Sequence, residues 1–341
     1  MTRLTRAALI ASAAALAFAA LVASASAADP VNVEAAKKEG KVVWYTSTPI
    51  EAAQKVVNLF QDSTGIKVEM FRSGGSAIMS RFQQEMQAGR IAVDLVTSSD
   101  PAAAQMLAKK GVFVAFRPEN FEKVPNEAKD PNGYYIPQRL NMMTHYFRRD
   151  KIAEKDQPKT WAELINPKYK GQMVMADPSF TSLQLSVFGM MSRKLGWDYY
   201  EKLAKNDVMI VQGGQQVSDM LKRGERLIAV GASDSYATDD RQEGHPIMTV
   251  YPEDGTFLIP SPSAVVKGSP NPQAAKLFAA FMLTDAVQKV FPARGSYAAR
   301  TDIPAPPDSP ALGSLRFTAV DYDFLEKEGS RLKKRFSEIF Q

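Results

Sequence analysis

Six turns rich in hydroxyl groups and glycine are the segments whose residue types and spacing could do chemistry. Each turn follows a segment expected to be a strand and precedes one expected to be a helix. Main-chain N–H groups at a helix N-terminus lack intrahelical partners and carry a partial positive charge, and hydroxyl groups add further donors. Such turns can hold a small oxyanion without a basic side chain. Serine, threonine and aspartate are also ordinary helix caps, so it is the set of turns that favours a binding cleft.

Candidate ligand-binding residues lie in these turns and at the helix starts that follow them. They are Ser47, Thr48, Ser73, Gly74, Gly75, Ser76, Ser98, Ser99, Asp177, Ser179, Thr181, Ser182, Ser235 and Tyr236, with Gly213 and Gly214 in a further turn. Asp177 or Asp234 could pair with an ammonium group of the ligand, and Tyr236 could pack against its body. We expect no catalytic residue and no cofactor among them.

The elements that would position these turns repeat the order strand, turn, helix. Strands are expected over residues 41–45, 66–71 and 93–96, and again over residues 172–176, 208–211 and 227–232. Repeated strand–helix units predict a parallel α/β sheet. Ligands of open α/β sheets bind at the carboxyl ends of the strands, which is where the turns lie.

Two long extended segments, residues 134–148 and 256–266, are expected to cross between two lobes. The sequence therefore predicts a hinged, two-lobed α/β fold with parallel or mixed sheets in each lobe. The expected boundaries place residues 28–138 and 261–341 in lobe 1, residues 139–260 in lobe 2, and hinge strands near residues 136–146 and 256–264.

The N-terminal residues have the pattern of a removable secretory signal. Arg3 and Arg6 form a short basic region, an alanine-rich apolar run covers residues 7–22, and Ala25 and Ala27 fit the small-residue pattern that signal peptidase cleaves. We expect cleavage after Ala27 and a periplasmic product. The apolar run is shorter than the roughly 20 residues that a spanning helix needs. The sequence has no cysteine, which excludes lipid anchoring and disulfide bonds.

Composition and charge are typical of a globular protein that does not bind nucleic acid. The chain of 341 residues suggests two domains of roughly 150 residues each once the signal is removed. Its formal net charge of +5 falls by two with the loss of Arg3 and Arg6, and the densest basic cluster, residues 331–335, is expected to be a solvated helix face. Common hydrolase, zinc-protease and nucleotide-binding motifs are absent, so an enzyme is not expected.

Several segments spread over the mature chain resemble one known family. They are residues 42–47, 71–76, 81–85, 92–96, 160–164, 168–172 and 271–276. In combination they resemble the periplasmic solute-binding proteins of ABC importers (extracellular solute-binding family 1), particularly the branch that contains the ferric-ion-binding proteins. The resemblance implies two lobes that close around a small-molecule ligand, with a membrane permease and an ATPase as partners. We expect a monomer without stable membrane insertion.

Two departures from the ferric-binding pattern bear on the ligand. The relatives that bind ferric iron carry a histidine or carboxylate after the first strand and two adjacent tyrosines after a strand of the second lobe. Here the first position reads Thr48-Pro49-Ile50-Glu51, and the second carries the single Tyr236. The favoured ligand is a small anionic or zwitterionic solute with a carboxylate, phosphonate or phosphate group. Ferric iron, held by Tyr236 with Asp177 or Glu51, stays open as an alternative, as does a secreted enzyme.

Overall fold

The computed structural model describes residues 28–126 and 128–341. The secretory signal expected over residues 1–27, with its cleavage point after Ala27, lies outside the described residues. None of the helices in the described part of the chain is long and apolar enough to cross a membrane.

Local sequence signals account for the elements that form. Gly40 and Gly65 end the first two described helices in the left-handed conformation that glycine adopts at least cost. The helices are α2 (Val33–Glu39), α3 (Ile50–Thr64), α4 (Gly75–Gln87), α5 (Pro101–Lys109), α6 (Ser182–Leu195), α7 (Trp197–Ala204), α8 (Gly214–Arg223), α9 (Asp234–Gln242), α10 (Pro272–Phe281), α11 (Asp285–Gln288), α12 (Val290–Ala293) and α13 (Tyr322–Phe340). The strands are β1 (Lys41–Thr46), β2 (Lys67–Arg72), β3 (Leu95–Thr97), β4 (Ile136–Arg148), β5 (Met173–Ala176), β6 (Met209–Val211), β7 (Ile228–Ser233), β8 (Ile247–Val250), β9 (Phe257–Val265) and β10 (Tyr297–Ala298).

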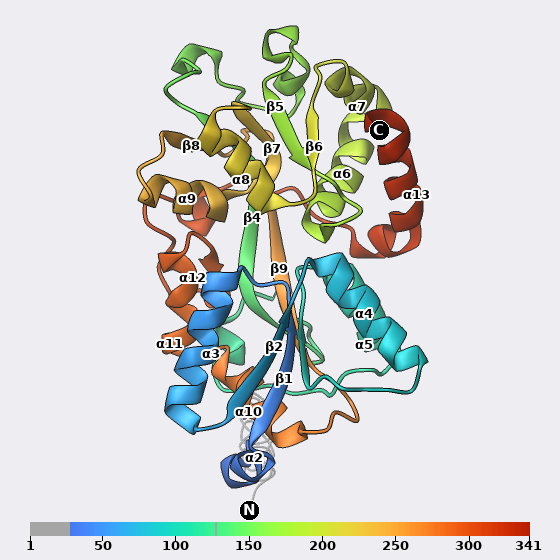
Figure 1. Ribbon diagram of the computed structural model, residues 1–341, viewed down its shortest axis with the longest axis vertical. Coiled ribbons are helices and arrows are strands. Elements are labelled where there is room, and N and C mark those ends of the chain that lie inside the picture. Colours follow the sequence, from blue (N-terminus) through green and yellow to red (C-terminus); the bar gives the residue numbers. More distant parts are fainter. Residues whose placement is uncertain (1–27, 127) are drawn as a thin grey trace, which may run out of the picture.

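Within the described residues, the strands form one mixed sheet that runs through two lobes (Figure 1). The strand order is β2-β1-β3-β9-β4-β7-β5-β6, with β8 and β10 also paired to β4. The strands β1, β2 and β3 are mutually parallel, as are β5, β6 and β7. The long strands β4 and β9 pair antiparallel with each other between these groups. The fold is therefore the two-lobed α/β architecture that the sequence predicted.

Each lobe has its own apolar core. In the lobe built on β1–β3, which we call lobe 1, Trp44, Phe60 and Phe278 are fully buried and their rings are in contact. In the lobe built on β5–β8, which we call lobe 2, the corresponding centre is formed by Trp161 and Phe188. Because the lobes have separate cores and are joined by extended strands, they can move as rigid bodies with little rearrangement of packed side chains.

The C-terminal helix corrects the expected lobe boundary. Residues 261–341 were assigned to lobe 1, but Leu325, Leu332 and Phe336 of α13 belong to the core of lobe 2. A side chain at Gly189 of α6 would lie 2.6 Å from Leu325, so the glycine permits the close approach of the two helices. The chain thus crosses between the lobes a third time before α13. The sequence pattern missed this crossing because residues 299–321 contain no long strand.

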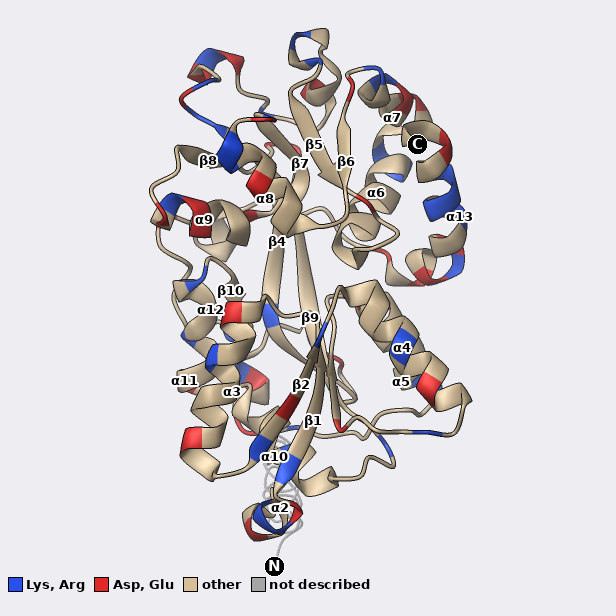
Figure 2. Cartoon of the chain, in the orientation of Figure 1, with Lys and Arg blue, Asp and Glu red and all other residues tan. Residues whose placement is uncertain are grey.

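Positions with Lys or Arg and positions with Asp or Glu both occur along α13 (Figure 2). The basic cluster of residues 331–335 belongs to α13, where Arg335 pairs with Glu201 and Glu338, and Arg331 pairs with Glu328. These ion pairs place the cluster on an ordinary solvated helix face.

Candidate functional site

A cavity of about 520 Å³ lies between the lobes, at the carboxyl ends of the parallel strands. Its wall combines segments from lobe 1, from strand β4 and from lobe 2. The lining residues are Ser47, Pro49, Arg72, Ser73, Gly74, Gly75, Ala77, Ser99, Arg139, Asn141, Met143, Ala176, Phe180, Thr181, Ser182, Leu183, Gln184, Gln212, Gly213, Gly214, Gln215, Gln216, Val217, Ala232, Ser233, Ser235 and Tyr236. This size falls within the usual range for small-molecule sites, roughly 300–1,000 Å³.

Arg139 of β4 supplies a buried positive charge to this cavity. Its side chain is 2% exposed, and its two Nη atoms donate to Gln138 Oε1 (2.9 Å), Thr48 Oγ1 (3.1 Å) and Ser99 Oγ (3.3 Å). The Nε atom is buried without a hydrogen-bond partner, and no carboxylate pairs with this guanidinium within the described residues. Burial lowers the pKa of Arg139 to about 10, so it remains charged at neutral pH.

Arg72 brings a second guanidinium to the same cavity from the end of β2. Its Nε donates to the carbonyl oxygen of Thr48 at 3.1 Å, and its positive charge contributes to the lowered pKa of Arg139. Tyr236 of α9 lines the same cavity as both guanidiniums. Burial raises the pKa of its phenol, and the two positive charges oppose this rise. Two like charges held together without a carboxylate between them leave an electrostatic site that an anion can satisfy.

The lobes touch directly beside the cavity. Ser182 of α6 donates its Oγ to the carbonyl oxygen of Ser99 at 2.8 Å, which is a hydrogen bond from lobe 2 to lobe 1. A side chain at Gly75 would lie 2.7 Å from Ser182 Oγ and 3.2 Å from Ser98 Oγ. The absence of a side chain at this helix start therefore allows the two lobes to approach this closely.

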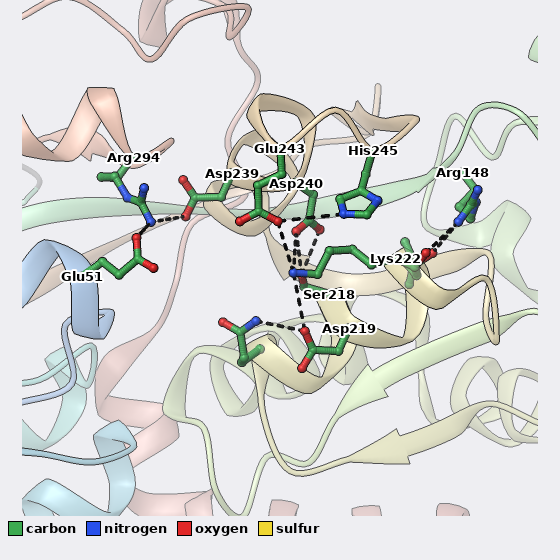
Figure 3. A network of polar contacts seen from close by, with 12 residues as sticks. Glu51, Arg148, Ser218, Asp219, Lys222, Asp239, Asp240, Glu243, His245 and Arg294 are labelled. Carbon is green, nitrogen blue, oxygen red and sulfur yellow. Dashed lines mark hydrogen bonds and ion pairs between the residues drawn. The ribbon is translucent and has the colours of Figure 1, made fainter.

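A second contact between the lobes lies at Arg294, after α12 (Figure 3). Its guanidinium forms an ion pair with Glu51 of α3 in lobe 1 and lies 3.6 Å from Asp239 Oδ2 of α9 in lobe 2. A side chain at the neighbouring Gly295 would lie 2.5 Å from Thr238, so the backbones also approach closely here. These contacts tie the helix that carries Tyr236 to lobe 1.

The structure brings most of the predicted site residues to the cavity. Those that line it are Ser47, Ser73, Gly74, Gly75, Ser99, Thr181, Ser182, Ser235 and Tyr236, together with Gly213 and Gly214. Thr48 instead lies fully buried beneath it, where its Oγ1 donates to Gln138 Oε1 at 2.7 Å and accepts from Arg139. Thr48 therefore holds the guanidinium of Arg139 in position.

The other predicted contacts lie outside this cavity. Ser98 is buried and donates to the carbonyl oxygen of Gly75 at 3.2 Å, and Ser76 and Ser179 are not among the lining residues. Asp177 accepts from the backbone N–H of Ser179 at 2.7 Å and lines a separate cavity near the end of α13. Helix-start turns expose only some of their side chains to a shared cleft, because the others cap the turn itself.

Sequence reasoning missed the charged and amide groups of the site. It expected an oxyanion to be held without a basic residue, whereas Arg72 and Arg139 both line the cavity, with Gln184, Gln212, Gln215 and Gln216 opposite. The sequence does mark Arg139, because an arginine in a strand that is otherwise expected to be buried needs a polar partner. No comparable signal marks Gln184.

The residues suggested for ferric iron are not brought together. Glu51 pairs with Arg294, Asp177 lines the other cavity, and Tyr236 lines the same cavity as two guanidiniums. The adjacent Tyr199 and Tyr200 are buried in the core of lobe 2. In the described part of the chain, no group of three or more His, Cys, Asp or Glu residues could hold a metal ion. Ferric iron prefers several anionic oxygen ligands, which this cavity does not present.

Comparison with known proteins places the chain among transport-related binding proteins. Residues 55–315 match the family of bacterial extracellular solute-binding proteins. A relative described as an uncharacterized protein from Haemophilus influenzae is 25% identical over 313 residues, which covers 88% of this chain and 89% of the relative. A protein named probable ABC transporter periplasmic-binding protein y4fP, from Sinorhizobium fredii, is 21% identical over 228 residues and covers 63% of this chain and 62% of the relative.

Solved structures of low identity share the fold over almost their whole length. The periplasmic binding protein AfuA from Actinobacillus pleuropneumoniae, solved with exogenous fructose-6-phosphate bound, has a TM-score of 0.79 at 19% identity and covers 88% of this chain and 98% of its own. Iron-bound HitA from Pseudomonas aeruginosa has a TM-score of 0.76 at 22% identity and covers 86% and 98%. From its sequence match, this chain belongs to the bacterial extracellular solute-binding protein family.

Proposed function

We propose that this protein is the solute receptor of an ABC-type importer and captures a small anionic or zwitterionic solute between its lobes. The ligand carries a carboxylate, phosphonate or phosphate group. The observation that carries this proposal is the pair of guanidiniums of Arg72 and Arg139, which line the cavity without a carboxylate partner among the described residues. An oxyanion bound there would satisfy the buried Arg139 and form charge-assisted hydrogen bonds.

Family membership and the names of similar proteins support the transport role. The Sinorhizobium relative and a solute-binding protein of Agrobacterium tumefaciens with the same fold are both named as ABC transporter components. A permease and an ATPase would be its partners. The mature protein would be a periplasmic monomer, formed by cleavage after Ala27. The cavity lining contains no Asp, Glu, His, Lys or Cys, which supports binding without chemical conversion.

Ferric-iron transport is the less supported alternative. Several proteins that share the fold bind iron according to their names, HitA among them. In this chain, a ferric ion near Tyr236 would face the positive charges of Arg72 and Arg139. Coulomb repulsion at such short range disfavours a trivalent cation unless a bound anion screens the guanidiniums.

The test is isothermal calorimetry on the secreted protein with a panel of oxyanions, run on the natural sequence and on Arg139→Gln. Removing a buried charge that binds an anion costs about 2–5 kcal/mol, so we expect a loss of affinity of at least about 30-fold. Arg335→Gln is the matched control, because Arg335 lies on the outer face of α13 in ion pairs with Glu201 and Glu338. The affinity of Arg335→Gln for the oxyanion should equal that of the natural sequence.

Arg72→Gln is a second variant that should fold normally, because Arg72 is exposed and forms no ion pair within the described residues. If Arg139→Gln fails to fold, Arg72→Gln alone should still weaken oxyanion binding. Unchanged affinity in both variants, or ferric binding that survives both while no oxyanion binds, would contradict the proposal.

A further inference from the structure

We infer that the solute is an oxyanion with an uncharged, hydroxyl-bearing body, that Gln184 recognises a hydroxyl group of that body, and that the site rejects an ammonium group. This inference rests on the proposed function and narrows it, because both anionic and zwitterionic ligands are compatible with the two guanidiniums alone. It concerns the wall of the cavity opposite Arg139.

Gln184 is a buried amide that has no hydrogen-bond partner in the described part of the chain. It lies in the first turn of α6, lines the cavity and is 1% exposed. Its side chain takes part in no hydrogen bond within the described residues. Its two polar atoms are nevertheless not fully enclosed by protein atoms. The amide therefore reaches the cavity surface, where its unmet hydrogen-bonding capacity is available to a ligand.

The rest of the lobe 2 wall carries no charge and combines apolar side chains with hydroxyl and amide groups, including three more glutamines. Gln212, Gln215 and Gln216 come from the start of α8, beside Gly213 and Gly214. Two of them are partly engaged: Gln216 Oε1 accepts from the backbone N–H of Gln212 at 2.7 Å, and Gln215 Nε2 donates to Asp219 at 3.1 Å. Amide groups donate and accept, and so does a hydroxyl group, which makes them suitable partners for each other.

An ammonium group would find no counter-charge in this cavity. The two acids considered for that purpose lie elsewhere: Asp177 lines the other cavity, and Asp234 is buried against Tyr251, whose hydroxyl donates to it at 3.2 Å. The cavity lining holds no carboxylate, and both of its charged groups are guanidiniums. Removing water from an unpaired ammonium group here would cost free energy without compensation. Arg72 and Arg139 would also repel this group.

The experiment compares three pairs of probes in which one hydroxyl is exchanged for an ammonium group. Glycerate and serine carry a carboxylate, 2-hydroxyethylphosphonate and 2-aminoethylphosphonate carry a phosphonate, and glucose 6-phosphate and glucosamine 6-phosphate carry a phosphate. Affinities are measured by calorimetry at pH 7.5 on the secreted full chain. The three pairs distinguish the source of the oxyanion, and each pair isolates the ammonium group.

We expect at least one hydroxylated probe to bind and its ammonium counterpart to bind at least about tenfold more weakly. Equal or tighter binding of the ammonium member, with affinity still lost in Arg139→Gln, would overturn this inference and leave the proposed function standing. Binding of uncharged glucose that does not change in Arg139→Gln would overturn both. Failure of all three hydroxylated probes to bind at millimolar concentration would overturn the inference, because the class includes each of them.

Gln184→Met tests the role given to that amide, because methionine keeps a similar length without the hydrogen-bonding groups. For the hydroxylated probe that binds, we expect about tenfold weaker affinity, whereas inorganic phosphate should change by less than about threefold. Gln54→Met is the matched control, because Gln54 is an exposed glutamine of α3 that does not line the cavity. Equal losses for the probe and for inorganic phosphate would show that Gln184 only supports the fold of the site, which would overturn its assignment.

Discussion

The two walls of the interlobe cavity differ in charge and in how their polar groups are held. On the side of lobe 1 and β4, Arg72 and Arg139 are positioned by hydrogen bonds to Thr48, with Ser99 also accepting from Arg139. On the side of lobe 2, the polar side chains are uncharged amides and hydroxyls, and Gln184 has no hydrogen-bond partner among the described residues.

This difference indicates that the walls do different work. A guanidinium that the surrounding protein already holds in place loses little freedom when an anion binds, so we expect the lobe 1 wall to provide most of the affinity. Neutral amides contribute less energy each, but they discriminate between hydroxyl groups and charged groups. We therefore expect lobe 2 to contribute selectivity and closure.

Truncating one exposed residue on each wall should separate the two contributions most strongly. Arg72→Ala removes a charge-assisted hydrogen bond, worth about 1.5–3 kcal/mol, and should weaken oxyanion binding about 10- to 100-fold. Gln212→Ala removes a neutral amide and should cost less than about tenfold. Calorimetry with the same oxyanion measures both. Equal losses at the two positions would contradict the division between the walls.

Gly75→Ala should weaken binding by obstructing closure, without removing any ligand contact. Its Cβ would lie 2.7 Å from Ser182 Oγ, closer than real side-chain contacts allow. We expect about tenfold weaker affinity, by analogy with overpacking costs of about 1–3 kcal/mol, and a more open average shape in X-ray scattering with ligand present.

The partner variant Ser182→Ala makes room for that methyl group. The double variant Gly75→Ala with Ser182→Ala should therefore bind more tightly than Gly75→Ala alone. If the double variant is weaker than both single variants, the glycine does not act through contact between the lobes.

Arg294→Gln should have a small effect, because Arg294 and its partners Glu51 and Asp239 are partly exposed to solvent. Exposed ion pairs contribute about 0.2–1 kcal/mol, so we expect ligand affinity to change by less than about fivefold, and less still at 0.5 M salt. A change that exceeds the effect of Gly75→Ala would show that closure depends on this contact.

Asp234→Asn should leave ligand binding unchanged and alter only the pH dependence of stability. Burial raises the pKa of Asp234 to about 8 in the folded protein, against about 3.9 when unfolded. The folded state thus holds a proton that the unfolded state releases, and stability is lost as pH rises from about 4 through about 8.

Chemical denaturation at pH 5 and pH 8 measures this effect. The natural sequence should lose on the order of a few kcal/mol between these values relative to Asp234→Asn. Nearby titratable groups are Tyr251, Tyr297 and Arg241. Equal pH dependence in the two proteins would show that Asp234 is not protonated at pH 5 to 8 in the folded state. A change in ligand affinity would place it in the site.

The sequence alone was sufficient to predict the repeated strand–helix units of the fold. The strand expected over residues 227–232 appears as β7 (Ile228–Ser233), and helix α3 (Ile50–Thr64) ends at Gly65. These elements follow from side-chain periodicity and from glycine at helix ends, which act within a few residues of the chain. The same local signals identified the hydroxyl-rich turns, and hence the edge of the sheet at which the cavity lies.

Only the tertiary structure decided which side chains meet there. Thr48 and Ser47 are neighbours in one turn, yet Thr48 is buried under Arg139 while Ser47 lines the cavity. Arg139 and Gln184 lie in separate lobe-forming segments, and α13 joins the core of lobe 2 through Leu332 and Phe336. Local patterns specify the elements, but contacts between distant segments depend on how complete lobes pack. The pairing of a positively charged wall with an uncharged wall arises only at that level.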